Sequence, residues 1–357
     1  MEFETVEQKP RPVNEANRLS QHETKDGDIH TQYIKFIVEG LKSSPRYLPS
    51  VLLWDSVGLG IYEQLMCAKD YYLTHIEKEV LQTHIDAIVE SIGEGGVIIE
   101  LGSGCLSKTR IILETFVRQQ KHVTYYALDV CRSTLAQSLS DLRTHLKDSR
   151  YVVCRPLCMT YLDSVAWVTD NADILRGKRI SVLWLGGSVG NESRDELERL
   201  LGGLHNAARR ANMLMQFLVG VDGNKDSETV ARAYDTRDGL SRRFILNVLT
   251  NLNRTFHTLI VNPNKWTFDG EWDEGKAIYR SSVKALEDQV INLGQHVLKI
   301  ARGEKIHVII SRKISSEEFG HWLSGSGWIV VEAWKHHEMD YGFYRLSPDS
   351  SPAKGGS

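Results

Sequence analysis

The chain has 357 residues, of which 41% are hydrophobic and 25% are charged, and its formal net charge is −3 at pH 7. This composition is typical of a globular protein, and the mixture of both charge signs argues against a nucleic-acid partner, which would need a basic surface. No run of about 18 apolar residues occurs, so we expect no membrane-spanning helix. The opening segment MEFETVEQKPRPVNE is polar and acidic, unlike a signal or transit peptide, and we therefore expect a cytoplasmic protein.

The N-terminal part of the chain predicts helices. Residues 1–28 lack apolar periodicity, and we expect them to be disordered. Thr74 and Glu77 have the spacing of a capping box, in which the first side chain accepts a helix N–H group and the second reaches back. Helices are therefore predicted over 31–44, 56–68 and 74–92, the last of them stopped by Gly93.

The central part alternates between strands and helices. Strands are predicted at 97–104, 122–130, 150–158, 180–191 and 212–222, several of them running into loops. Helices are predicted between them at 107–120, 131–146 and 193–209. This alternation predicts βαβ units and therefore an α/β fold with a parallel, doubly wound sheet.

After Asp222 the regular alternation of predicted strands and helices ends. A long helical stretch over 228–256 is interrupted near Gly239, and strand-like runs return at 305–314, 328–336 and 341–347, the last two as a hairpin on the sheet edge. We expect the early helices and this excursion to form one mixed helical cap over the strand ends. The predicted parts are a substrate-binding cap of 29–75 plus 223–312, a cofactor-binding domain of 76–222 plus 313–347, and a disordered Ser/Pro/Gly-rich tail of 348–357.

Two strand ends predict a cofactor that contains adenosine. Ligands of open α/β sheets bind beyond the carboxyl ends of the strands, and Gly102, Ser103 and Gly104 would let the backbone approach one there. The next strand ends in Asp129, whose carboxylate can accept both ribose hydroxyls. NAD and S-adenosylmethionine (SAM) both fit this pattern, and a plain tight turn is the alternative. The third glycine of the dinucleotide fingerprint is missing, which favours SAM, and Glu100 would suit its positive charges.

A third strand end runs into the loop LGGSVGN, which ends at Asn191. This glycine-rich loop could press against a substrate, because the Asn side chain offers both a donor and an acceptor. No metal site is predicted: the five cysteines have no zinc-like spacing, and the pair His336 and His337 lacks a third ligand in pattern.

An ordered set of segments from about residue 48 to residue 313 carries a resemblance to a known family. The segments are LPSVLLWDSVGLGIYEQL, DYYLTHIEKEVL, IELGSGCLSKTRIILE, YYALDV, LWLGGSVGN, ARAYDTRDGLSRRFILNVLTNLNR and ISRK. The set is similar to the SAM-dependent methyltransferases that act on the α-amine of an amino acid, which include the histidine enzyme of ergothioneine biosynthesis and fungal dimethylallyltryptophan N-methyltransferases. The resemblance implies a Rossmann-like class I methyltransferase sheet, SAM as cofactor, an amino acid as substrate and a monomer.

The resemblance also implies roles for residues near the cofactor. Gly102, Ser103, Gly104, Lys108 and Asp129 match the positions that hold it, and Gly186 would offer a backbone contact beside the transferred methyl group. The Asp-Phe pair that holds adenine in the family is replaced by Thr160 and Tyr161. An acid is lost there, although Tyr161 can still stack on the adenine.

For the substrate, the resemblance implies that Asn191 and Tyr234 hold the carboxylate and that Tyr71 lies at the amine. Tyr71 and Asn191 are the candidate catalytic residues, and they would act by alignment, which can supply on the order of 7–11 kcal/mol. Whether Tyr71 also passes a proton to water is left open. The pocket would be lined by Trp54, Gly186, Ser188, Phe244, Tyr279, Ile309 and Ser311.

The side-chain pocket departs from that of the histidine enzymes. They bind the imidazole ring with a Glu and a Ser, which match Ile309 and Ser311 here. A shift of one residue would put Val308 or Ile310 at the Glu position, and both are apolar too. Because a site built for a polar ring loses discrimination when its polar partner becomes apolar, we expect tryptophan as the substrate. Histidine and 4-dimethylallyltryptophan stay as alternatives, as do a catalytically idle binding protein and an NAD oxidoreductase. The number of methyl groups transferred is left open.

Overall fold

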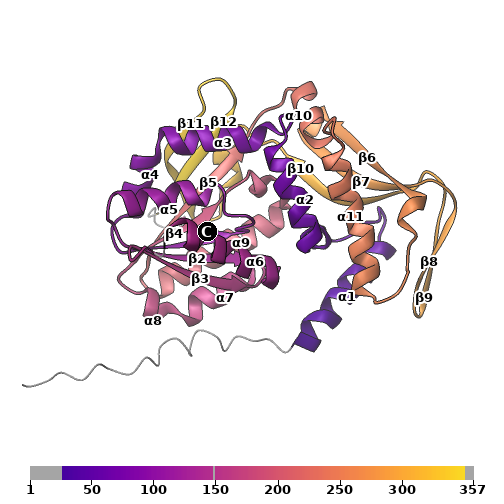
Figure 1. Ribbon diagram of the computed structural model, residues 1–357, viewed down its shortest axis with the longest axis horizontal. Helices are drawn as coiled ribbons and strands as arrows, with labels where there is room; N and C mark the ends of the chain where they lie inside the picture. The colour runs from indigo at the N-terminus through magenta and orange to yellow at the C-terminus, as the bar shows by residue number, and fades with distance from the viewer. Residues whose placement is uncertain (1–25, 148, 350–357) are drawn as a thin grey trace, which may run out of the picture.

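The computed structural model describes residues 26–147 and 149–349 of the chain, and side chains from residue 33 onward. The segments 1–25 and 350–357, which hold most of the termini expected to be disordered, lie outside the described residues. The first described helix begins at Asp26, just inside the N-terminal segment expected to be disordered. Figure 1 shows a sheet with its helices on one side of the molecule and a second group of helices and strands on the other.

The helices follow the predicted order, with three additional short ones after residue 160. The α-helices are α1 (Asp26–Lys42), α2 (Ser56–Cys67), α3 (Tyr72–Thr83), α4 (Ile85–Ile92), α5 (Thr109–Arg118), α6 (Arg132–His145), α7 (Asp163–Asp170), α8 (Ala172–Leu175), α9 (Arg194–Arg210), α10 (Ser227–Tyr234), α11 (Leu240–Thr255) and α12 (Ser316–Trp322). The short 3₁₀ helices are η1 (Ser50–Leu53), η2 (Ser188–Asn191), η3 (Pro263–Lys265) and η4 (Glu274–Lys276).

The strands form a large mixed sheet and two smaller sheets. They are β1 (Gly96–Leu101), β2 (Val123–Asp129), β3 (Val152–Cys158), β4 (Arg179–Trp184), β5 (Leu214–Asp222), β6 (Trp266–Asp273), β7 (Ile278–Ala285), β8 (Gln289–Leu293), β9 (His296–Ile300), β10 (Lys305–Arg312), β11 (Trp328–Lys335) and β12 (Tyr341–Pro348). The large sheet has the order β11-β12-β5-β4-β1-β2-β3.

The large sheet confirms the predicted class I methyltransferase architecture. Strands β1 to β5 are parallel, β12 pairs antiparallel with β5, and β11 pairs with β12. The final hairpin therefore lies at the sheet edge as predicted. The sheet is not parallel throughout, because the short connection between β11 and β12 reverses the chain direction.

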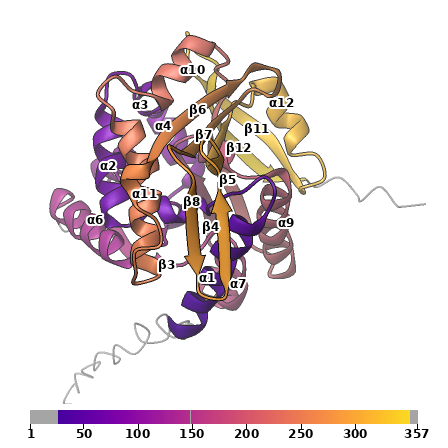
Figure 2. The ribbon, with the colours of Figure 1, turned by 90° about the vertical axis from the view of Figure 1, so that its right-hand side faces the viewer.

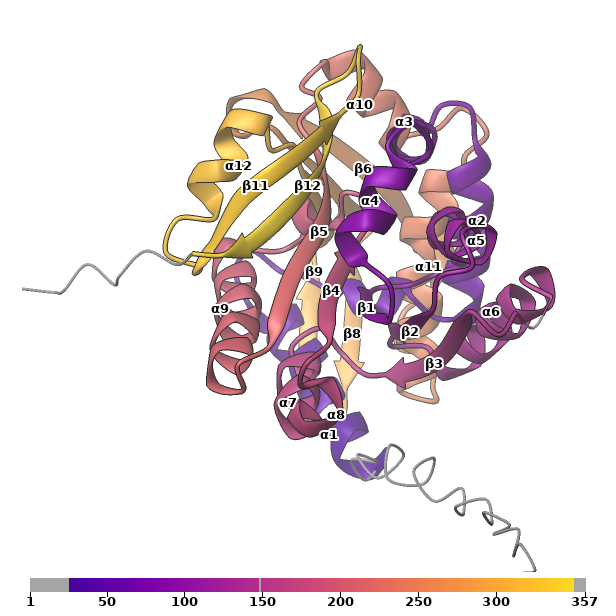
Figure 3. The same ribbon diagram turned by 90° about the vertical axis from the view of Figure 1, so that its left-hand side faces the viewer.

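Helices cover both faces of this sheet. One hydrophobic cluster joins α3, α4, α5 and α6 to one face, and a second joins α7, α9 and α12 to the other. Figure 3 shows these two layers on either side of the sheet. Every residue of β1 is buried, which is typical of a parallel strand covered on both faces and places its carboxyl end inside the molecule.

A third hydrophobic cluster forms the core of the remaining part, which we call the cap: α1, η1, α2, α10, α11 and β6 to β10 (Figure 2). It joins Leu41 of α1 to Val248 of α11 and Ile306 of β10. The cap is less helical than expected, because it contains the sheet β10-β7-β6 and the hairpin β8-β9. The strand predicted at 305–314 is β10, and it pairs with β7 in the smaller sheet.

The expected capping box at Thr74 is wrong. The helix α3 begins two residues earlier, at Tyr72, with Tyr71 at the N-cap position. Both Thr74 and Glu77 are buried, and the carboxylate of Glu77 is occupied by partners from other elements. The predicted helix 74–92 is also divided at His84. Within the part of the chain that the structure describes, no helix is both long and apolar enough to cross a membrane.

Candidate active site

The glycine loop and Asp129 meet at the carboxyl ends of β1 and β2. Gly102 and Gly104 have positive φ values of 68° and 52°, a conformation that glycine adopts without the penalty of a Cβ atom. The Ser103 N–H donates to the carbonyl oxygen of Leu128, and the Gly104 N–H donates to Asp129 Oδ2, both at 3.0 Å. The loop is therefore tied to the neighbouring strand, with the Asp129 carboxylate directly beneath it.

The surroundings of this loop fit an adenosine-containing cofactor. The Ser103 hydroxyl is buried and has no hydrogen-bond partner among the described residues. A Cβ atom at Gly102 would clash with the hydroxyl of Tyr161, whose ring packs edge-on against Trp184 at 5.6 Å. A buried hydroxyl without a partner costs free energy, so a ligand that bonds it would stabilise this loop.

The structure places Glu100 beneath the loop rather than in it. Its carboxylate accepts hydrogen bonds from Thr109 at 2.6 and 2.8 Å and from the Tyr125 hydroxyl. Burial raises the pKa of Glu100 to about 7, although the hydrogen bonds from Thr109 and Tyr125 act in the opposite direction. The expected contact with the positive charges of a cofactor is therefore replaced by an internal role, which is to hold the start of α5 against β1 and β2.

The buried carboxylate of Glu77, which was expected only as part of a capping box, joins three elements at the site. It accepts hydrogen bonds from Lys108 Nζ at 2.6 Å and from the Gly186 N–H at 2.8 and 2.9 Å. Burial alone would lower the pKa of Lys108, but Glu77 and Tyr62 raise it above its ordinary value. Lys108 and the Gly186 N–H are thus already engaged within the protein. Glu77 lies three and four residues before Val80 and Leu81, and an acid on that apolar face was the signal that could have identified it.

Four aromatic side chains, from the residue after η1, from α2, from the N-cap position of α3 and from α11, form a cluster that we call the aromatic wall. Trp54 packs against Tyr62 and Phe244 with ring centroids 5.1 Å apart in each pair. Tyr62 also contacts Phe244 at 5.4 Å and Tyr71 at 6.1 Å. Tyr62 was not among the residues predicted from the sequence, although it lies at the centre of this cluster.

Tyr71 is joined to the aromatic wall through its hydroxyl. The hydroxyls of Tyr62 and Tyr71 lie 3.1 Å apart, and only 5% of Tyr71 is exposed. Burial, with Tyr62 and Tyr234 close by, raises the pKa of Tyr71 well above its ordinary value. Tyr71 therefore stays protonated at neutral pH and can donate a hydrogen bond, but it does not act as an anionic base.

A polar network lies on the other side of Tyr71. The hydroxyls of Tyr234 and Ser311 are 2.5 Å apart, and the Tyr234 ring stacks on Tyr279 at 5.0 Å. Lys313 Nζ donates to the Tyr234 hydroxyl at 2.8 Å and to Asp222 Oδ2 at 2.5 Å. The Tyr71 and Tyr234 rings contact each other edge-on at 6.2 Å, so the aromatic wall and this network adjoin.

The remaining residues selected from the sequence lie on η2 and β10. Asn191 ends η2 and is half-buried, and its side-chain amide has no hydrogen-bond partner within residues 26–147 and 149–349. The Ser188 hydroxyl donates to the Leu185 carbonyl at 2.8 Å and so stabilises its own loop. On β10, Ile309 and Ser311 are two residues apart and hence share one side of the strand, where Ser311 is paired with Tyr279.

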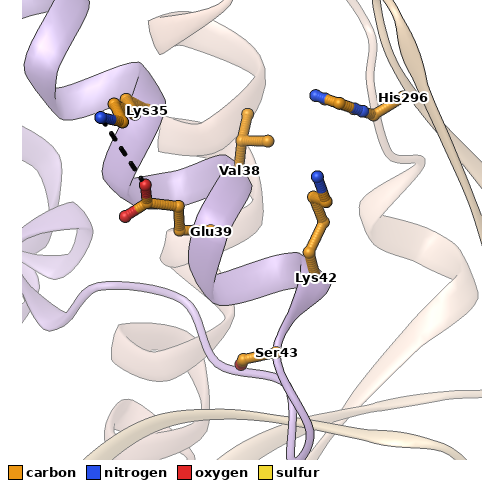
Figure 4. Close-up of a pocket in the computed structure, with 6 residues that line it drawn as sticks. All are labelled: Lys35, Val38, Glu39, Lys42, Ser43 and His296. Atoms are coloured by element: carbon orange, nitrogen blue, oxygen red, sulfur yellow. Dashed lines mark ion pairs between the residues drawn. The ribbon is translucent and has the colours of Figure 1, made fainter.

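A separate surface hollow of about 500 Å³ lies between α1 and β9 (Figure 4). Lys35 forms an ion pair with Glu39 there, and none of the hollow's residues was selected from the sequence. It is lined by Lys35, Val38, Glu39, Lys42, Ser43 and His296. No group of three or more His, Cys, Asp or Glu side chains suited to a metal ion occurs among the residues described.

Comparisons with known proteins show the family to which this chain is similar. A family described as "Histidine-specific methyltransferase, SAM-dependent" matches residues 33–348. The N-methyltransferases imqF and dtpB of Aspergillus flavus are 31% and 34% identical to this chain, over 86% and 91% of it and 82% and 89% of their own lengths. The 4-dimethylallyltryptophan N-methyltransferase easF of Aspergillus fumigatus is 28% identical over 87% of this chain and 92% of its own.

Proposed function

Since the chain belongs to the family of histidine-specific, SAM-dependent methyltransferases and is a SAM-dependent N-methyltransferase, we propose that it methylates the α-amine of a free aromatic amino acid, with L-tryptophan as the substrate. The observation that carries the choice of substrate is the apolar Ile309 at the position where a polar ring would need an acid. The aromatic wall beside Tyr71 supports the same choice.

The glycine loop suits the cofactor in this proposal. The residues that would hold SAM are Gly102, Ser103 and Gly104 in the loop, with Asp129 beneath it and Tyr161 beside it. When bound, SAM supplies an electrophilic methyl group on a sulfonium centre. The chain itself offers the unpartnered Ser103 hydroxyl and a loop backbone in which two glycines adopt positive φ values.

The chain's own residues would then position the amine. An α-amino group has a pKa near 8 in peptides, so it must lose its proton before it can attack a methyl group. A protonated Tyr71 cannot remove that proton, but its oxygen can accept a hydrogen bond from the amine and thereby fix its direction. The amide of Asn191 can both donate and accept. In this view the rate enhancement comes from alignment, which can supply about 7–11 kcal/mol.

The pocket chemistry favours an indole ring over an imidazole ring. Ile309 packs against the hydrophobic cluster of the cap, in which Trp54 and Phe244 also take part. An imidazole has two nitrogens that need hydrogen-bond partners, and a buried one left unpaired costs about 1–3 kcal/mol. An indole has a single N–H group and a larger apolar surface.

Two alternative substrates also have support. Histidine is supported by the description of the family and by the Ser311 hydroxyl, which could bond one ring nitrogen. 4-Dimethylallyltryptophan is the substrate named for one relative, and its additional apolar chain would also suit a pocket without an acid.

Mass spectrometry of the reaction products tests the proposal. The protein would be incubated with SAM and, separately, with tryptophan, histidine, phenylalanine, tyrosine and 4-dimethylallyltryptophan. The expected result is a mass gain of one or more methyl groups on tryptophan while histidine stays unchanged, and the same spectra count the methyl groups. Methylated histidine with unchanged tryptophan would refute the assignment of an apolar pocket.

A further inference from the structure

A buried ion pair lies directly behind the residues proposed to bind the amino-acid head group. Lys313 Nζ and Asp222 Oδ2 are 2.5 Å apart, and their side chains are only 1% and 2% exposed. Lys313 follows β10 of the cap, and Asp222 ends β5 of the large sheet. Burying two charges costs several kcal/mol of desolvation, so a pair of this kind calls for a function or for excellent geometry.

The carboxylate of Asp222 has further partners on both of its oxygens. It accepts hydrogen bonds from the Tyr72 hydroxyl at 2.7 Å and from the Asn224 N–H at 3.0 Å, in addition to Lys313. Burial would lower the pKa of Lys313, but Asp222, Tyr234 and Tyr72 raise it well above its ordinary value. The ammonium group therefore stays charged, and its other close partner is the Tyr234 hydroxyl at 2.8 Å.

This contact fixes the direction of the hydrogen bonds that follow. An ammonium group can only donate, so the Tyr234 oxygen accepts from Lys313. If Tyr234 donates its own proton to Ser311, the Ser311 proton is left over, and if Ser311 donates to Tyr234, the Tyr234 proton is left over. In both arrangements one hydroxyl proton has no acceptor among the described residues, although both side chains are half-buried.

The missing partner is thus an acceptor, and its environment favours an anion. The hydroxyl chain begins at a cation 2.8 Å behind it, which polarises each O–H group toward a negative charge. Tyr71 and Tyr279, which flank Tyr234, present aromatic rings and no carboxylate of their own.

We propose that Lys313 is a positioning residue that acts through Tyr234 to recognise the carboxylate of the substrate, so that the enzyme selects free amino acids over the corresponding decarboxylated amines. This proposal rests on the proposed function, but it does not depend on which ring the substrate carries. Lys313 does not touch the substrate, and its charge reaches the carboxylate through the Tyr234 hydroxyl, to which Ser311 can donate.

The test is a comparison of kcat/KM for tryptophan and tryptamine, and for histidine and histamine, in wild type and Lys313→Met. We expect the preference for the acid over the amine to fall about 10- to 100-fold in Lys313→Met, mainly through KM of the amino acid, while the binding of SAM is unchanged. Equal losses for the acid and its amine would show that Lys313 only supports the fold, and would overturn the proposal.

Two further variants keep the test decisive. Lys313→Met leaves Asp222 buried without its partner, so the double variant Lys313→Met/Asp222→Asn removes both charges and should fold, with the same loss of preference. Tyr72→Phe is the matched control, because it removes a partner of Asp222 and leaves the contact between Lys313 and Tyr234, and its preference should equal that of wild type. Should histidine prove to be the substrate, the ratio of histidine to histamine gives the same answer, so failure of the tryptophan assignment is distinguishable.

Discussion

The hydroxyls of Tyr62 and Tyr71 lie 3.1 Å apart, one on α2 and the other at the N-cap position of α3. This hydrogen bond joins the cap to α3, which packs against the large sheet, at the point where the amine is proposed to bind. It also leaves the Tyr71 hydroxyl with a fixed orientation, since Tyr71 is almost fully buried.

Removing the Tyr62 hydroxyl should therefore slow methyl transfer. Tyr62→Phe keeps the ring in the aromatic wall but takes away the partner of Tyr71. A typical hydrogen bond contributes about 0.5–1.5 kcal/mol, so we expect kcat to fall roughly 3- to 10-fold with little change in the affinity for SAM. Steady-state kinetics would show this. Tyr151→Phe, a change at a half-buried tyrosine before β3, is the control, and an equal loss in both variants would contradict the role of Tyr62.

Introducing an acid at residue 309 should change the choice of substrate. Ile309→Glu would supply a hydrogen-bond acceptor for an imidazole beside the Ser311 hydroxyl. We expect kcat/KM for tryptophan to fall about 10- to 100-fold and that for histidine to rise. Ile310→Glu is the control, because adjacent residues of a strand point to opposite sides. A gain of histidine activity in the control alone would mean that residue 310, and not 309, faces the pocket.

The sequence was sufficient for the large sheet because each of its central strands is a short apolar run between helices with clear periodicity. It was insufficient for the cap sheet, since β7 (IYRSSVKA) buries Ser281 and Ser282, and β6 contains Asp269 and Gly270. Such strands lack the alternation of apolar and polar residues on which a strand prediction depends.

Some residues of the candidate site could likewise be predicted from the sequence, and others could not. The loop residues could be located because glycines and an acid at strand ends have a known use in parallel sheets. Glu77 and Lys313 were missed because their importance comes from burial and from partners far away in the chain. A charge in an otherwise apolar pattern is the signal, but the pattern does not say which partner it meets.

Breaking the contact between Glu77 and Lys108 should destabilise the fold. Glu77→Gln leaves the buried ammonium of Lys108 without its carboxylate and weakens the bond to the Gly186 N–H. We expect the free energy of unfolding to fall by roughly 3 kcal/mol, as measured by urea denaturation. The double variant Glu77→Gln/Lys108→Met should recover part of that loss. If the double variant were less stable than the single one, the ion pair would not be the source of the effect.

Removing the unpartnered hydroxyl of Ser103 should have opposite effects on the stability of the ligand-free protein and on its affinity for SAM. Ser103→Ala removes a buried polar atom that has no partner among the described residues, so the ligand-free protein should be as stable as wild type or slightly more stable. If SAM bonds this hydroxyl, its Kd should rise about 3- to 10-fold, as titration calorimetry would measure. Ser107→Ala, in the same loop, is the control. An unchanged Kd in Ser103→Ala would place the cofactor away from this hydroxyl.

Glu100 should make the fold less stable as the pH rises from about 4.5 to about 7. Its ordinary pKa is 4.5, and burial raises it to about 7 in the folded protein. Between these values the folded state binds more protons than the unfolded state, so the free energy of unfolding falls with rising pH, by up to about 3 kcal/mol from this group. Above pH 7 both states are ionised and the contribution no longer changes.

Glu100→Gln should remove this part of the pH dependence. The free energy of unfolding of the variant, measured relative to that of wild type, should therefore be higher at pH 8 than at pH 4.5. Urea denaturation at several pH values would measure both. Burial also raises the pKa of Glu192 to about 7, so wild type carries two contributions of the same sign. Glu192→Gln is therefore the matched control, which should flatten the remaining part of the curve. If Glu100→Gln left the slope between pH 4.5 and 7 unchanged, the Glu100 carboxylate would be ionised in the folded protein, held by Thr109 and Tyr125 despite its burial.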